Sequence, residues 1–266
     1  MIGIFDSGLG GLSALKEVRR LMPHEDIVYF GDTGRVPYGT RSKETIIKYS
    51  LQDMNFLVSH NIDAVMVACG TASSNALAVL RKTYPDIPII GVIDAGARAA
   101  AKATKNNIIG IAGTPSTIGS RAFENALQEI DSNFKMIPAA CPLFVPLVEN
   151  GFISPDEEIT QLAAKTHLKS IIDAGADTLI LGCTHYPIIA GAISKVVPDA
   201  TLINVGAAAA EELREIMSSR TDTDTNRIGK VQYFVSDEPQ GFERIASIFL
   251  GEEISDTVTR IDIEKY

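Results

Sequence analysis

The chain has 266 residues, 45% of them hydrophobic, and a formal net charge of −9 at pH 7. This length suits one large or two small domains, with ample apolar material for their cores. An acidic chain without a stripe of lysine and arginine is a poor candidate for binding nucleic acid or an anionic membrane surface. No uncharged apolar run reaches roughly 18 residues, so we expect no segment to cross a membrane.

The cysteines and the N-terminus indicate the cellular compartment in which we expect the protein. An apolar strand begins at once, with no basic leader or cleavage site, which argues against secretion. The cysteines are Cys69, Cys141 and Cys183, without a Cys-x-x-Cys pair or the spacing of a disulfide framework. Reduced thiols in a cytoplasmic protein are the expectation.

Short apolar runs alternate with stretches of helical periodicity along most of the chain. The apolar runs predict strands at residues 2–5, 27–30, 63–68, 87–92, 108–112, 135–138, 177–182 and 201–205. The stretches between them predict helices at 11–21, 43–60, 73–83, 95–104, 117–130, 156–174, 187–195 and 207–218. The tail adds a strand at 231–235 and a helix at 240–249. This alternation is typical of parallel sheets covered by helices on both faces.

Two cysteines occupy equivalent places in what reads as an internally duplicated chain. Asp63 opens the apolar run that leads to Cys69, and Asp177 opens the run that leads to Cys183. A threonine follows each cysteine within two residues, and a helical stretch comes next. A repeat of roughly 110 residues has the size of a domain rather than of a solenoid unit.

The duplication predicts an α/β fold of two related domains, each with a doubly wound parallel sheet, related by pseudo-twofold symmetry. We expect the tail to pack on the first half, so that residues 1–94 and 207–266 form one discontinuous domain and residues 95–206 the other. Ligands of such sheets bind beyond the carboxyl ends of the strands. We therefore expect the active site in the cleft between the domains.

A cysteine between a strand and a helix has a physical reason to be reactive. The helix N-terminus offers N–H groups and partial positive charge, which stabilise a thiolate and lower the pKa of the cysteine below ~8.5. A single buried cysteine is more often inert packing, and we expect this of Cys141. Cys69 and Cys183, at duplicated strand ends, favour two-base proton transfer from opposite sides of one cleft.

Polar residues beside the cysteines leave several interpretations open. Asp6 ends the first strand and could take or relay a proton, and Ser7 could cap the next helix. His185 could assist Cys183, or bind zinc together with Cys69 and Cys183. It could also be oriented by Glu149 in a Cys–His–Glu hydrolase.

Several motifs resemble those of the bacterial glutamate racemase family, and the resemblance covers nearly the whole chain. They are FDSGLGG at 5–11, YFGDT at 29–33, VPYG at 36–39, PLVE at 146–149 and LGCTHYP at 181–187, with VACGTAS at 67–73 a near match. The resemblance implies cofactor-independent interconversion of L- and D-glutamate, which supplies D-glutamate for peptidoglycan. A homodimer with no metal, nucleic-acid or membrane partner is the accompanying expectation.

The resemblance also implies roles for individual residues. Cys69 would deprotonate D-glutamate and Cys183 L-glutamate, from opposite faces of the α-carbon. Asp6 would support Cys69, and Glu149 with His185 would support Cys183. The implied substrate-binding residues are Asp6, Ser7, Pro37, Tyr38, Gly39, Gly70, Thr71, Thr114, Thr184 and His185.

One position departs from the family pattern, which has Cys-Asn-Thr where this chain has Cys69-Gly70-Thr71. In the family the missing amide contacts the substrate, and one lost hydrogen bond costs about 0.5–1.5 kcal/mol. Restoring it by Gly70→Asn is expected to raise kcat/KM on glutamate. A racemase of another acidic amino acid, a single-thiol decarboxylase or isomerase, and a non-catalytic amino-acid-binding module remain alternatives.

Overall fold

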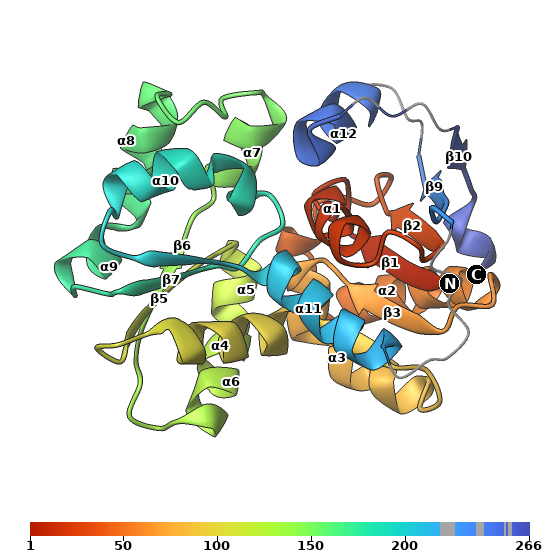
Figure 1. Cartoon of the computed structure of the whole chain (residues 1–266), viewed down its shortest axis with the longest axis horizontal. Coiled ribbons are helices and arrows are strands. Elements are labelled where there is room, and N and C mark those ends of the chain that lie inside the picture. Colours follow the sequence, from red (N-terminus) through yellow and green to blue (C-terminus); the bar gives the residue numbers. More distant parts are fainter. Residues whose placement is uncertain (219–226, 238–241, 253, 255–256) are drawn as a thin grey trace.

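Two parallel sheets flanked by helices make up the fold (Figure 1). The computed structural model describes residues 1–218, 227–237, 242–252, 254 and 257–266. We call the part built on the six-stranded sheet the first half and the part built on the four-stranded sheet the second half. They lie on the right and on the left of Figure 1, respectively. The predicted α/β fold with two related parallel sheets is confirmed.

Four neighbouring strands of the first sheet follow the same order as the four strands of the second sheet, so the ends of corresponding strands are equivalent. The first sheet has the order β10-β9-β2-β1-β3-β4 and the second β6-β5-β7-β8, and all neighbours are parallel. Strand β3 therefore corresponds to β7, and β1 corresponds to β5. The strands are β1 (Ile2–Asp6), β2 (Ile27–Gly31), β3 (Ala64–Val67), β4 (Ile89–Gly91), β5 (Ile108–Gly113), β6 (Lys135–Ala140), β7 (Thr178–Leu181), β8 (Thr201–Asn204), β9 (Val231–Val235) and β10 (Val258–Arg260).

Helices follow most strands and cover both faces of the sheets. The α-helices are α1 (Leu12–Leu21), α2 (Lys43–Val58), α3 (Gly70–Thr83), α4 (Val92–Ala103), α5 (Pro115–Ser120), α6 (Ala122–Ile130), α7 (Phe144–Glu149), α8 (Glu158–His167), α9 (Lys169–Asp173), α10 (Ala190–Val196), α11 (Val205–Met217) and α12 (Phe242–Leu250). Short 3-10 helices are η1 (Tyr38–Thr40), η2 (Tyr186–Ile189) and η3 (Ile263–Lys265).

Some predicted elements differ from the observed ones for local reasons. The helix predicted at 117–130 is divided into α5 and α6, because Arg121 has the left-handed backbone conformation at φ 57°. The helix predicted at 156–174 is divided at Leu168. Strand β10 and helix α7 were not predicted, since three and six residues are too few to show a period. Residues 240 and 241, the start of the last predicted helix, lie outside the described residues.

Side chains of the central strand β1 alternate between two buried faces. Ile2 and Ile4 belong to one hydrophobic cluster, to which α1 and α11 also contribute. Phe5 belongs to the other, to which α2 and α3 contribute. Burial on both faces explains why the strands of this sheet read as continuous apolar runs.

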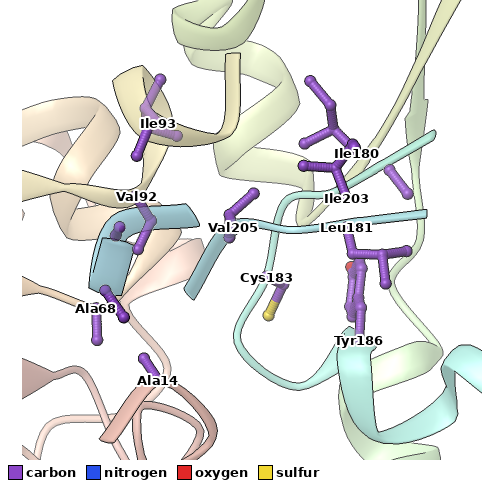
Figure 2. Packing of buried hydrophobic residues seen from close by; sticks show 14 of the residues in the cluster. Ala14, Ala68, Val92, Ile93, Ile180, Leu181, Cys183, Tyr186, Ile203 and Val205 are labelled. Atoms are coloured by element: carbon purple, nitrogen blue, oxygen red, sulfur yellow. The ribbon is translucent and has the colours of Figure 1, made fainter. Parts of the chain in front are cut away.

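The larger of these clusters continues from one half of the molecule into the other. In Figure 2, Val205 at the start of α11 lies between Val92 and Ile93 of α4 and the strand residues Ile180 and Ile203. Because these side chains are packed together in one core, packing fixes the two halves relative to each other.

The connections between the halves run through helices. The predicted domain division falls inside α4 at residue 94 and inside α11 at residue 207, and it stays a prediction. The tail returns to the first sheet, where β9 pairs with β2. Within the described part of the chain, no helix combines the length and the apolar character needed to span a bilayer.

Gly96 allows the close packing of α4 that joins the halves, and we predict that Gly96→Ala destabilises the protein. A Cβ there would lie 2.6 Å from Val205 Cγ1 and 3.2 Å from Phe123 Cε1. Overpacking costs about 1–3 kcal/mol, more than the ~1 kcal/mol that alanine gains over glycine in a helix. The free energy of unfolding, measured in urea, should therefore fall.

Gly119→Ala is the matched control, because a Cβ on Gly119 in α5 would meet nothing within 4 Å. This variant should be neutral, or more stable by up to about 1 kcal/mol. If Gly96→Ala proves as stable as Gly119→Ala, the contact between α4 and α11 does not constrain the halves.

Candidate active site

The carboxyl ends of four equivalent strands converge on one cavity of about 460 Å³. Asp6 ends β1 and Cys69 follows β3 in the first half, while Thr114 follows β5 and Cys183 follows β7 in the second. Parallel strands place these ends at one edge of each sheet, and the two edges face each other across the cavity.

Every site residue predicted from the sequence lines this cavity. They are Asp6, Ser7, Pro37, Tyr38, Gly39, Cys69, Gly70, Thr71, Thr114, Glu149, Cys183, Thr184 and His185. Sequence reasoning assigned no role to several other lining residues, which are Gly8, Leu9, Val36, Thr40, Pro115, Thr117, Cys141, Pro142, Val145, Pro146 and Gly182. Of these, Thr117 had a usable signal, because it lies one helical turn after the capping residue Thr114.

Cys69 lies where strand β3 passes into helix α3. Its sulfur caps the helix by accepting the N–H of Ala72 at 3.4 Å, and its thiol donates to Ser7 Oγ at 3.2 Å. Burial, reinforced by the negative charge of Asp6, nevertheless raises the pKa of Cys69 to about 12. The lowered pKa predicted for this cysteine is therefore wrong, because the hydrogen bonds of Ser7 and Ala72 to the sulfur do not offset burial beside a carboxylate.

Asp6 is a buried carboxylate with one oxygen turned to no protein donor. Its Oδ2 accepts the N–H of Gly8 at 2.9 Å, whereas no described residue reaches Oδ1 with hydrogen-bond geometry. Burial raises the pKa of Asp6, against the opposing effect of the positive charge on His185 and of nearby N–H groups. Oδ1 is thus a buried acceptor without a described donor, although the Asp6 residue lines the cavity.

Cys183 begins a chain of polar contacts on the other side of the cavity. Its sulfur lies 3.7 Å from His185 Nδ1, and His185 Nε2 lies 3.1 Å from Glu149 Oε1. Burial lowers the pKa of His185, but its hydrogen bonds to Cys183 and Glu149 outweigh that effect and raise it to about 10. Figure 2 shows the sulfur of Cys183 pointing away from Leu181 and Tyr186.

Contacts across the cavity hold its two walls together. Ser13 Oγ in α1 donates to the carbonyl oxygen of Thr184 at 2.7 Å. Thr71 Oγ1 and Thr114 Oγ1, from opposite halves, lie 3.4 Å apart. Both contacts join the halves next to the residues that line the cavity.

The geometry bears on two alternatives for His185. Among the described residues, no three His, Cys, Asp or Glu side chains are grouped as they would be to hold a metal ion, so a zinc site of Cys69, Cys183 and His185 is not supported. The Cys183–His185–Glu149 chain has the connectivity of a single-thiol hydrolase. A second strand-end thiol, Cys69, lines the same cavity from the first half.

Known proteins place the chain in a family. The sequence profile described as Asp/Glu/Hydantoin racemase matches residues 12–213. The chain belongs to this racemase family. A glutamate racemase of Geobacter metallireducens is 44% identical over 99% of the chain and 97% of that protein. One from Persephonella marina is 46% identical over 95% of the chain and 94% of that protein.

A solved structure of a racemase agrees with this assignment. The glutamate racemase of Francisella tularensis, solved in complex with D-glutamate, is 35% identical, with a TM-score of 0.92 over 100% of this chain and 98% of that one. The resemblance to the glutamate racemase family and the enzyme class, an amino-acid racemase, are both confirmed.

The His185 contacts predict a histidine in this racemase that stays protonated at neutral pH. NMR of the imidazole nitrogens should place its pKa at about 10. Glu149→Gln should lower that value, because the amide removes a negative partner of the imidazolium.

His167 is the internal control, because burial lowers its pKa and it lies on another helix, α8. Its titration should not change in Glu149→Gln. If His185 is neutral at pH 7 in the wild type, the prediction that its contacts keep it protonated is wrong.

Proposed function

We propose that this racemase interconverts L- and D-glutamate without a cofactor, using Cys69 and Cys183 as its two bases. One observation carries the proposal: two thiols at topologically equivalent strand ends line the same cavity from different halves. Relatives named glutamate racemase, at 44% and 46% identity, support the substrate. A single-thiol enzyme would not need the second strand-end cysteine.

In the L-to-D direction, Cys183 removes the α-proton. His185, protonated and held in place by Glu149, stabilises negative charge on the Cys183 sulfur. The sulfur takes the proton from the α-carbon as the C–H bond breaks. Cys69, whose high pKa keeps its thiol protonated, then gives a proton to the opposite face. Turnover leaves Cys183 as the thiol and Cys69 as the thiolate, which Ser7 and the Ala72 N–H stabilise.

The developing carbanion is stabilised by fixed dipoles of the cavity. The first turns of α3 and α5 begin at the cavity, so their N–H groups can face the substrate carboxylate. Thr71 and Thr114 add hydroxyl donors. Asp6, which lines the cavity, can attract the substrate ammonium group. A buried site strengthens each of these contacts.

We also propose the setting in which this activity works. D-glutamate would enter peptidoglycan synthesis in the cytoplasm, and the enzyme would be a homodimer. Residues 1–94 with 207–266 and residues 95–206 would act as two domains that face each other across the substrate. The motif resemblance supports each of these points.

Racemisation in deuterated water tests the two-base proposal. D-Glutamate formed from L-glutamate should carry deuterium at the α-carbon from the first turnover, while the remaining L-glutamate keeps its hydrogen. Cys69→Ser and Cys183→Ser should each lower racemisation at least ~100-fold, because serine is a far weaker acid than cysteine. The value of kcat/KM should fall by the same factor in both directions, because the equilibrium constant between the two enantiomers is one.

Cys141→Ser is the matched control for these variants. Cys141 is buried and lines the cavity, but it follows β6, whose equivalent β2 is followed by Asp32 and not by a second cysteine. The Ala139 carbonyl oxygen, 3.5 Å from the Cys141 sulfur, can accept from the new hydroxyl. This variant should stay active. Near-wild-type racemisation by either strand-end variant would exclude the two-base mechanism.

The structure gives a reason to revise the outcome expected for Gly70→Asn. A Cβ on Gly70 would lie 2.5 Å from the carbonyl oxygen of Gly182, the residue before Cys183. A backbone atom cannot rotate aside as a side chain can, so a substitution must push the two cysteine-bearing segments apart. We therefore predict that Gly70→Ala and Gly70→Asn each lower kcat/KM on glutamate by about tenfold.

Comparing the two variants on both enantiomers of glutamate and aspartate separates the steric effect from the amide contact. If the asparagine amide contacts the substrate, kcat/KM on the preferred substrate should be higher for Gly70→Asn than for Gly70→Ala. If kcat/KM of Gly70→Asn is above that of wild type, the two cysteine-bearing segments accommodate the side chain, and the increase expected from the family motif is correct.

A further inference from the structure

A buried polar cluster lies directly behind one wall of the cavity. It consists of Asp32, Arg35 and Tyr38, which follow β2, and of Asp53 in α2. Asp32 and Asp53 are fully buried and Tyr38 is 1% exposed.

The cluster anchors a largely exposed segment of the chain. Of residues 36–40, only Tyr38 is buried; Val36, Pro37 and Thr40 are exposed and Gly39 is half-buried. All five line the cavity. Tyr38 thus attaches this wall to the protein through the hydrogen bonds of its phenol and through its ring, which packs against Tyr49. What the phenol bonds to therefore affects the position of the wall.

The hydrogen bonds require one more proton than the tyrosine supplies. Tyr38 Oη contacts Asp32 Oδ2 and also Asp53 Oδ2, the latter at 2.9 Å. A phenol has one proton and can donate to only one of two carboxylate oxygens. The other contact needs a proton that belongs to a carboxyl group.

The remaining contacts decide which carboxyl group holds it. Asp32 accepts from Arg35 Nε at 2.7 Å and from Ser236 Oγ at 2.7 Å, as an ionised carboxylate does. Asp53 accepts from Arg35 Nη2 at 2.9 Å through Oδ1, and within the described chain the hydrogen-bond contact of its Oδ2 is with Tyr38 alone. The proton therefore belongs on Asp53 Oδ2.

The charges of the cluster lead to the same assignment. The groups that face Asp53 are Asp32, Arg35, Tyr38 and, further off, Asp6. One guanidinium cannot neutralise two buried carboxylates, and an unpaired buried charge is costly. Burial and the charge of Asp32 raise the pKa of Asp53 well above its usual range. Glu264 also contacts Arg35, at 3.3 Å, but its side chain is 59% exposed and largely screened.

We propose that Asp53 is a positioning residue that acts as a neutral carboxylic acid: it donates a hydrogen bond to Tyr38 and so holds the segment 36–40 against the substrate. The bonds run from Asp53 Oδ2–H to Tyr38 Oη, and from Tyr38 O–H to Asp32 Oδ2. Asp53 acts through Tyr38 and touches no substrate itself.

Asparagine and leucine at this position separate a neutral donor from a charge. In Asp53→Asn the amide oxygen can accept from Arg35 and the amide nitrogen can donate to Tyr38, so KM for glutamate should stay within about twofold of wild type. Asp53→Leu removes both bonds and should raise KM about tenfold with a smaller change in kcat. Tyr38→Phe should also raise KM, and the effects of the two changes should be less than additive in the double variant, because the Asp53–Tyr38 hydrogen bond is lost in all three.

An infrared measurement tests the proton itself without using activity. The wild type at neutral pH should show the carbonyl band of a protonated carboxylic acid that disappears in Asp53→Asn and persists in Asp199→Asn, a change at an exposed aspartate. The kinetic readout rests on the proposed glutamate racemisation, whereas the infrared band does not. A wild type that leaves glutamate unchanged would thus refute the function while the band still decides the state of Asp53.

Three results would overturn the proposal. The first is an infrared difference spectrum between wild type and Asp53→Asn without that band. The second is a KM for Asp53→Asn as high as that of Asp53→Leu, which would mean that the charge is required. The third is an unchanged KM in a folded Asp53→Leu. If the leucine variant does not fold, the asparagine variant and the spectrum remain decisive.

Discussion

The cavity depends on the contact between the start of α3 and the end of β7. Gly70 and Gly182 meet there without side chains between them, and each is the immediate neighbour of a strand-end cysteine. This close approach brings the two cysteine-bearing segments together at the cavity. The continuous core that reaches from α4 through α11 to β7 holds the halves in register. The Ser13 and Thr71 hydrogen bonds act at the cavity itself.

The two strand-end cysteines occupy equivalent positions in the fold but have different polar neighbours. Cys69 has a buried carboxylate and a hydroxyl beside it, whereas Cys183 has an imidazole backed by a carboxylate. Because a carboxylate disfavours a nearby thiolate and an imidazolium favours one, the two thiols lie in different electrostatic environments. The proposed mechanism needs one base and one acid at each turnover, and unequal environments are suited to these two roles.

The sequence was sufficient for features that depend on chain order. Strand ends, the equivalence of Cys69 and Cys183, and the residues around the cavity follow from apolar periodicity, duplication and motif resemblance. The resemblance placed Asp6 near Cys69, but the burial that, with the charge of Asp6, raises the pKa of Cys69 depends on the folded structure. The carbonyl oxygen of Gly182 that faces Gly70 comes from the other half of the molecule and could not be predicted. Asp53 lies inside a helix whose periodicity gives no sign that it faces a second carboxylate.

The charges of the two walls also depend on each other. Asp6 favours the protonated form of His185, and the positive charge on His185 favours the ionised form of Asp6. The charged groups beside the two thiols are therefore coupled across the cavity, and a change at one alters the protonation of the other. A substitution that neutralised Asp6 would lower the pKa of His185, which lies beside Cys183. A change in the reactivity of Cys183 in such a variant would therefore not show that Asp6 contacts Cys183. Roles in this site have to be assigned from contacts first and from the loss of activity second.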